Sequence, residues 1–262
     1  DLNSLYPSII RFLNISPETI LSEKHPQVSG VDVEKLINKE IDIQSPIDSD
    51  ICVAANGAQF RKDTQGMMPK LVIKMYEERV RYKKEMLRQK QILVDVENKI
   101  KNGDKSDETL NLHNQTVKEV TKFSNFQMVR KICLNSAYGA IGNAYFRYFK
   151  LANAEAITMS GQTSIRWIEK KLNEYMNKLL KTSEDYVIAS DTDSIYLRLG
   201  PLVNKVYTGD KNPGSIIQFM DKVCEDKIQP YIDESYQELA TYVNAYEQKM
   251  QMKREALCDK GI

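Results

Sequence analysis

Cysteine is scarce in this sequence, and the four residues are scattered. Cys52, Cys133, Cys224 and Cys258 form no CxxC pair, so the sequence predicts neither a disulfide framework nor a structural zinc site. It also lacks a run of about 18 apolar residues and a basic-then-apolar leader at its start. These absences predict a protein of a reducing cytoplasm, without export and without a membrane partner.

An excess of one charge sign is absent as well. The 37 Lys and Arg residues balance 36 Asp and Glu residues, which leaves a net charge of +1. A global basic field, typical of a small DNA-coating protein, is therefore excluded, and any affinity for nucleic acid must be local. The 262 residues suffice for one or two domains with a sizeable core, and no internal repeat is visible.

The charges that are present are unevenly distributed. Residues 31–50 carry six acids against two lysines, which predicts a solvated surface insertion. Between Pro69 and Lys90, eight Lys and Arg residues stand against three Glu residues. The chain opens at Asp1 inside an apolar stretch, so we interpret it as a fragment of a longer protein.

The hydrophobic pattern predicts an α+β fold with a helical excursion. A strand, a tight turn at Pro7 and a short helix are expected over 1–20. No Gly or Pro follows Pro69 until Gly103, which predicts a long helix, and a second helix from 105–122 to Tyr138–Gly139 would complete a protruding hairpin.

The remaining elements follow from the same periodicities. An amphipathic helix is expected from Leu151, a β-hairpin over 186–197, a helix over about 214–247 and a terminal strand that ends at Cys258–Ile262.

Two carboxylates lie at the predicted hairpin tip. Asp191 and Asp193 stand two residues apart, and like charges that close favour a bound cation such as Mg²⁺. Acids are also common in turns, so a plain turn is the alternative. Asp1, at an expected strand end, is a second source of acid, and an ordinary terminal acid is its alternative.

Cations and polar residues share faces of the two predicted long helices. Lys131, Asn135 and Tyr138 follow i, i+4, i+7 spacing, and Arg79 and Lys83 follow i, i+4 spacing. Three such cations suit a polyphosphate, whereas a solvated basic face is the alternative. Acids for metal and cations for phosphate together indicate phosphoryl or nucleotidyl transfer.

Several other residues are interpreted as structural. His25 and His113 lack partners at metal-ligand spacing and are expected at the surface, and Trp167 is expected to anchor the core. The aromatic residues of 145–149 could contact bases or close the core; we favour the core for Tyr145, Phe146, Tyr148 and Phe149.

Three ordered motifs resemble those of family B DNA polymerases. They are DLNSLYPSII, KICLNSAYGAIGN and SDTDSIYL, similar to polymerase motifs A, B and C. NISPETI and FRYFKLANAEAIT resemble the T-even-type bacteriophage replicative enzymes in particular. The resemblance implies a family B palm, an antiparallel sheet backed by helices, over 1–68 and 151–262, interrupted by a two-helix fingers hairpin over 69–150.

The resemblance also implies a role for each matching residue. Two Mg²⁺ ions would be held by Asp1, Asp193 and the Leu2 carbonyl, with Asp191 in support, and Lys131 would protonate the pyrophosphate. Tyr6 would exclude ribonucleotides by a steric clash, and Glu255 would be a secondary acid. The triphosphate would be contacted by the Ser4 and Leu5 amides and by the side chains of Arg79, Lys83 and Lys131. The nascent base pair and the template would be contacted by Asn135, Tyr138 and Gly139.

This sequence departs from the family pattern at motif C and near Glu255. Ala189-Ser190 stands where the family has Tyr-Gly, and Lys253 stands where the phage relatives have an acid. The resemblance does not cover the exonuclease, amino-terminal and thumb portions of the family's polymerases. Implied partners are primer-template DNA, dNTPs, those remaining portions and, as a further candidate, a sliding clamp, in a bacterial host cytoplasm.

Two other functions remain open at this point. A split or truncated, non-catalytic fragment could act only as a nucleic-acid or subunit-binding module. Another palm-type nucleotidyl enzyme, such as an RNA polymerase or a cyclase, is a third hypothesis, against which Tyr6 argues.

Overall fold

The polypeptide folds into two units in the computed structural model, which describes residues 2, 4–28, 33–43, 50–210 and 212–258. One unit comprises Asp1–Pro69 and Ile141–Ile262, and the other comprises Lys70–Ala140. Helices and small antiparallel sheets make an α+β protein, as predicted. The palm and fingers assignments stay predictions. None of the described helices is long and apolar enough to cross a membrane.

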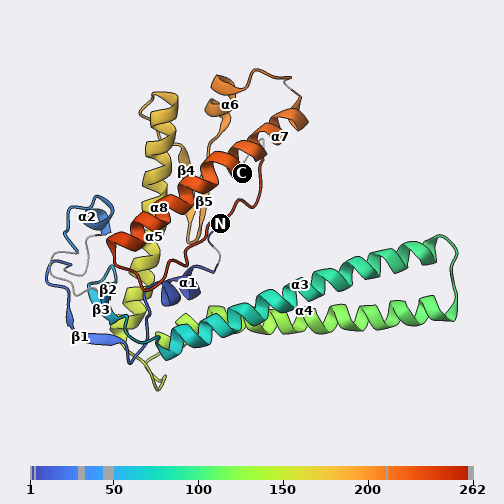
Figure 1. Cartoon of the computed structure of the whole chain (residues 1–262), viewed down its shortest axis with the longest axis horizontal. Coiled ribbons are helices and arrows are strands. Elements are labelled where there is room, and N and C mark those ends of the chain that lie inside the picture. Colours follow the sequence, from blue (N-terminus) through green and yellow to red (C-terminus); the bar gives the residue numbers. More distant parts are fainter. Residues whose placement is uncertain (1, 3, 29–32, 44–49, 211, 259–262) are drawn as a thin grey trace. The chain divides into compact units, whose positions relative to one another are not determined.

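The Lys70–Ala140 unit is a hairpin of two long helices (Figure 1), which confirms the predicted excursion. Helices α3 (Met67–Lys101) and α4 (Asp107–Ile141) have 35 residues each. The Arg130 guanidinium donates to the Glu78 carboxylate at 2.7 Å between them. The rings of Tyr82 and Phe126 pack 5.2 Å apart, so aromatic packing and an ion pair together join the helices.

The other unit is built on the long helix α5 (Leu151–Leu180). Helices α1 (Leu5–Phe12), α2 (Val33–Ile37) and α8 (Gln229–Tyr242) pack against it. Trp167 is only 1% exposed and donates its indole N–H to the Ser235 carbonyl at 2.9 Å. The predicted core anchor is thus confirmed.

A three-stranded antiparallel sheet, missed by the sequence analysis, joins the start of this unit to its core. Its order is β1-β3-β2, from strands β1 (Ile20–Lys24), β2 (Ile51–Val53) and β3 (Ala58–Arg61). Strands of three to five residues are too short to show a clear alternation in sequence.

The predicted hairpin over 186–197 is confirmed as strands β4 (Val187–Asp191) and β5 (Ser194–Leu197). The following helix α6 (Gly200–Val206) was missed. The predicted helix over 214–247 forms α7 (Pro213–Val223), a π-helical turn η1 (Cys224–Ile228) and α8. Residues 259–262 of the predicted terminal strand lie outside the described residues, whereas Met252 makes an isolated antiparallel bridge with Leu2.

The prediction of a solvated insertion over 31–50 is confirmed for its described acids, which are exposed, but is wrong for its apolar residues. Val33, Leu36 and Ile37 of α2 are buried, as is Ile43. These apolar residues pack on α5 and the core while the acids between them face outward. The net charge of residues 31–50 does not reveal the spacing of the apolar residues in this segment.

Two further structural interpretations are wrong. His25 is 2% exposed instead of lying at the surface. Tyr145 is 98% exposed instead of closing the core, and Tyr148 is also exposed. The cause is tertiary, because burial of a lone side chain depends on which distant segment covers it.

Candidate functional site

The β4–β5 hairpin, the carboxylate hairpin, has two carboxylates at one of its ends. Asp191 ends β4 and pairs in register with Ser194, so Thr192 and Asp193 form the turn. Thr192 adopts a φ of 48°, and its hydroxyl donates to Asp191 Oδ1 at 3.1 Å. The turn confirms the predicted tip and places both acids at it.

Asp193 lies in an unfavourable electrostatic environment. Partial burial raises its pKa above the ordinary value of 3.8, and the negative charges of Asp191 and Glu255 raise it further. Glu255, from the far end of the chain, therefore acts on the same site. A bound cation would relieve this repulsion.

The backbone of Leu2 meets this turn. The Leu2 N–H donates to the Asp193 carbonyl at 2.6 Å, and Leu2 is 1% exposed. The first and third motifs, far apart in the sequence, are thus in direct contact within one unit. Asp1, the residue before Leu2, lies outside the described residues.

The donors fit a hard divalent cation in chemistry, since carboxylate and carbonyl oxygens are the ligands of Mg²⁺. Within the described ranges, no group of three or more His, Cys, Asp or Glu side chains is placed to hold a metal ion by itself. Asp1 would have to complete the ligand set with Asp193 and Leu2.

Helix α1 begins beside this site. Ser4, its N-cap, has a left-handed φ of 54° and makes no side-chain capping bond. The first amides of a helix lack partners within the helix, which suits the predicted phosphate contact of Ser4 and Leu5. Leu5 and Tyr6 pack near Gly161 of α5, where an added Cβ would lie 3.4 Å and 3.6 Å from their side chains.

The second group of predicted residues lies on the α3–α4 hairpin, in the other unit. The Glu78–Arg130 bond fixes which sides of the two helices face each other. Arg79 and Lys131 follow these residues, and one residue rotates a helix by about 100°. Because the helices are antiparallel, both rotations lead to the same side of the hairpin.

Lys83, Asn135 and Tyr138 follow on that same side by their i+4 and i+7 spacing. Lys131, Lys83 and Asn135 are exposed, and Tyr138 is half-buried. The Nε of Arg79 is buried and makes no hydrogen bond. The structure therefore supports one face on the hairpin that carries all three predicted cations; Gly139 is exposed near its end.

Sequence reasoning missed the Glu78–Arg130 pair and an ion pair of Arg254 with Asp221. Acids four residues apart, Asp221 and Glu225, were the only signal for the second. Nothing in the sequence indicates which distant arginine they would meet.

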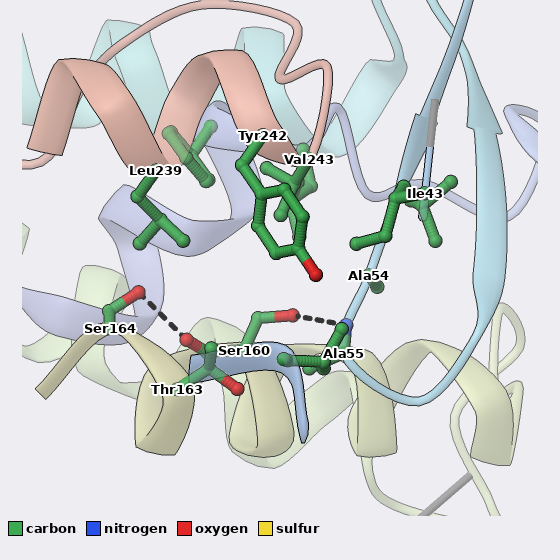
Figure 2. A pocket seen from close by; sticks show the side chains of 13 residues that line it. Ile43, Ala54, Ala55, Ser160, Thr163, Ser164, Leu239, Tyr242 and Val243 are labelled. Carbon is green, nitrogen blue, oxygen red and sulfur yellow. Dashed lines mark hydrogen bonds between the residues drawn. The ribbon is translucent and has the colours of Figure 1, made fainter. Parts of the chain in front are cut away.

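A pocket in the core is not part of the site (Figure 2). Its hydroxyls have partners: Ser160 Oγ accepts from the Ala55 N–H at 3.1 Å, and the Tyr242 hydroxyl donates to the Ile41 carbonyl at 2.8 Å. None of its lining residues belongs to the carboxylate hairpin. They are Phe12, Leu13, Leu36, Ile43, Val53, Ala54, Ala55, Ser160, Thr163, Ser164, Leu239, Tyr242 and Val243.

Comparison with known proteins adds independent evidence. A sequence model of the family described as DNA polymerase family B matches residues 1–102 and 93–208. The chain is 37% identical to the DNA-directed DNA polymerase of Enterobacteria phage T4 over 98% of the chain and 31% of that protein.

Two further relatives agree. The DNA-directed DNA polymerase of Escherichia phage RB69 is 32% identical over the whole chain and 32% of its own length. DNA polymerase 1 of Pyrococcus abyssi is 29% identical over 75% of the chain and 18% of its own length. The chain thus spans about a third of the length of the two phage proteins.

Proposed function

Because the chain belongs to DNA polymerase family B, we propose that it is the palm and fingers part of a DNA-directed DNA polymerase that adds dNTPs to a primer 3′ end during phage replication. The observation that carries this proposal is the contact of Leu2 with Asp193, which joins the first and third motifs at the carboxylate hairpin. Its partners would be primer-template DNA, dNTPs and the remaining portions of the polymerase, in the host cytoplasm. A sliding clamp is a further candidate partner.

Asp1, Asp193 and the Leu2 carbonyl would hold two Mg²⁺ ions, with Asp191 in support. When bound, these ions activate the primer 3′-hydroxyl and neutralise the triphosphate. Burial, and after it the negative charges of Asp191 and Glu255, raise the pKa of Asp193. This supports the proposed role, because a bound cation would favour the charged carboxylate.

The cationic face of the hairpin would bind the triphosphate. Arg79, Lys83 and Lys131 would pair with its β- and γ-phosphates through charge-assisted hydrogen bonds, and Lys131 would give a proton to the leaving pyrophosphate. The Ser4 and Leu5 amides would add phosphate contacts. The side chains of this face thus stabilise charge where it develops.

Selection of the correct nucleotide would depend on close packing of side chains against its sugar and base. Tyr6 would pack under the deoxyribose and leave no room for a 2′-hydroxyl. Asn135, Tyr138 and Gly139 would line the nascent base pair, where the exposed Gly139 lets a template base approach the backbone.

Primer extension tests the proposal, with the remaining polymerase portions supplied in trans. We expect Asp193→Asn to reduce Mg²⁺-dependent dNTP incorporation by about 100-fold or more, the effect of losing one electrostatic contact to reacting groups. Asp185→Asn, an exposed acid before β4, is the matched control and should retain activity.

Unchanged incorporation by Asp193→Asn would contradict the assignment of the metal site. If the native chain binds primer-template DNA but incorporates nothing under any reconstitution, the non-catalytic binding module is the better interpretation.

A further inference from the structure

The segment Met252–Glu255 passes directly beside the carboxylate hairpin. Met252 pairs with Leu2 in an antiparallel bridge, and both side chains are buried. Leu2 in turn donates to the Asp193 carbonyl at 2.6 Å. The segment is therefore joined through Leu2 to the backbone of Asp193, and Glu255 follows three residues after this bridge.

A row of side chains from α7, η1 and α8 holds the segment. The Arg254 guanidinium contacts the Asp221 carboxylate and lies 3.8 Å from Glu225 Oε1. Gln229 donates its side-chain amide to the Met252 carbonyl at 2.8 Å. Asp221, Glu225 and Gln229 follow i, i+4, i+8 spacing, so one side of this helical stretch serves one segment.

The π-helical turn η1 (Cys224–Ile228) lies within this row. In a regular α-helix, residue i+4 lies about 40° beyond a full turn, so a row of this spacing drifts around the helix. A π turn contains more residues and reduces the drift. The widened turn thus keeps Asp221, Glu225 and Gln229 directed at the same segment.

Arg254 and Glu255 act in different directions. Arg254 reaches the helices, where its charge faces two carboxylates, while the charge of Glu255 acts on Asp193. The charges of Arg254, Asp221 and Glu225 all act on the pKa of Cys224, which is buried in η1. Asp221 and Glu225 balance the charge of Arg254. Arg254 therefore influences the carboxylate site through the position of the segment more than through its own electric field.

We propose that Arg254, clamped by Asp221 and Glu225, is a positioning residue that fixes Glu255 beside Asp193 and thereby sets the metal affinity of the carboxylate site. This inference rests on the proposed function. The clamp couples α7 and η1 to the site through the Arg254 side chain.

The test measures Mn²⁺ affinity of the purified chain by electron paramagnetic resonance and hydrogen exchange of segment 250–258. We expect Arg254→Met to weaken Mn²⁺ binding about tenfold, as loss of an outer contact to a ligand does, and to speed exchange in the segment. Asp221→Asn, which removes the charge that Arg254 contacts on α7, should act in the same direction. Arg254→Lys should recover part of the affinity.

The control and the double variant separate positioning from general stability. Arg198→Met removes another arginine paired with a glutamate, Glu184, in the same unit, and should leave the Mn²⁺ affinity unchanged. Glu255→Gln should weaken binding without faster exchange, and Arg254→Met with Glu255→Gln should be no weaker than Glu255→Gln alone.

Additive losses in the double variant, or native affinity in both Arg254→Met and Asp221→Asn, would overturn the inference. Asp193→Asn reports separately on the proposed function. If it binds Mn²⁺ as the native chain does, the metal site itself is wrong; if it loses binding while Arg254→Met retains it, only the positioning role fails.

Discussion

Asp193, a residue of the proposed metal site, opposes folding when it is charged. Its pKa is raised, chiefly by burial and then by Asp191 and Glu255, so the folded chain holds this proton more tightly than the unfolded chain. The contribution to stability is therefore present at low pH and is lost as the pH rises through the window above the ordinary value of 3.8.

It follows that Asp193→Asn should raise the melting temperature at pH 7 in metal-free buffer, and that the gain should vanish toward pH 3.8. Thermal unfolding across this range measures the effect, with Asp185→Asn as control. A variant no more stable than the control at pH 7 would contradict it.

His25 gives the opposite pH dependence. Burial lowers its pKa below 6.5, although Asp42 and the Ile43 backbone oppose the shift; its Nε2 is buried without a hydrogen bond. The unfolded chain therefore binds more protons, and stability should fall as the pH falls below 6.5.

We expect His25→Asn to flatten the loss of stability between about pH 6.5 and pH 5, the range in which an ordinary histidine takes up its proton. Urea unfolding at several pH values measures it. His113→Asn, in the other unit, should leave the dependence unchanged, and an equal effect of both variants would argue against a role for burial.

At the scale of elements, the α3–α4 hairpin depends on contacts between its helices more than on its own periodicity. Arg130 donates to Glu78, and its guanidinium lies 5.6 Å from the centre of the Tyr82 ring. The hydrogen bond to Arg130 lowers the pKa of Glu78. This pair also fixes the side on which Arg79 and Lys131 lie.

Arg130→Met should therefore loosen the hairpin and speed amide exchange on both helices near residues 78 and 130. Arg88→Met, which loses only a pair within α3 with Glu85 at 3.5 Å, should have a much smaller effect. Equal exchange in the two variants would show that the pair between the helices is dispensable.

At the scale of the whole molecule, the net charge of +1 conceals separate fields. Carboxylates gather at the β4–β5 hairpin, and cations gather on one face of the α3–α4 hairpin. A bound ligand would respond to these local fields rather than to the net charge, since charges beyond a Debye length of about 8–10 Å are largely screened.

Lys83 and Lys84 test this distinction, because both are exposed on α3 and either change removes one positive charge. Lys83→Ala should weaken dNTP binding about 10- to 100-fold, as expected for one charge-assisted hydrogen bond. Lys84→Ala, directed about 100° further around the helix, should bind normally. Equal losses in a titration with dNTP would indicate a general charge effect.

The sequence by itself determined the long helices, the β4–β5 hairpin and the residues of both charged groups, because periodicity and spacing are local properties. It also sufficed to identify the family, through three ordered motifs. Asp191 and Asp193 needed no tertiary information to be recognised as a pair.

Only the tertiary structure decided what depends on contacts between distant segments. The approach of Leu2 and Glu255 to Asp193, the clamp on Arg254, the burial of His25 and the exposure of Tyr145 all have this origin. A side chain's partner and burial are set by which remote segment packs on it, and no local pattern in the sequence records that choice.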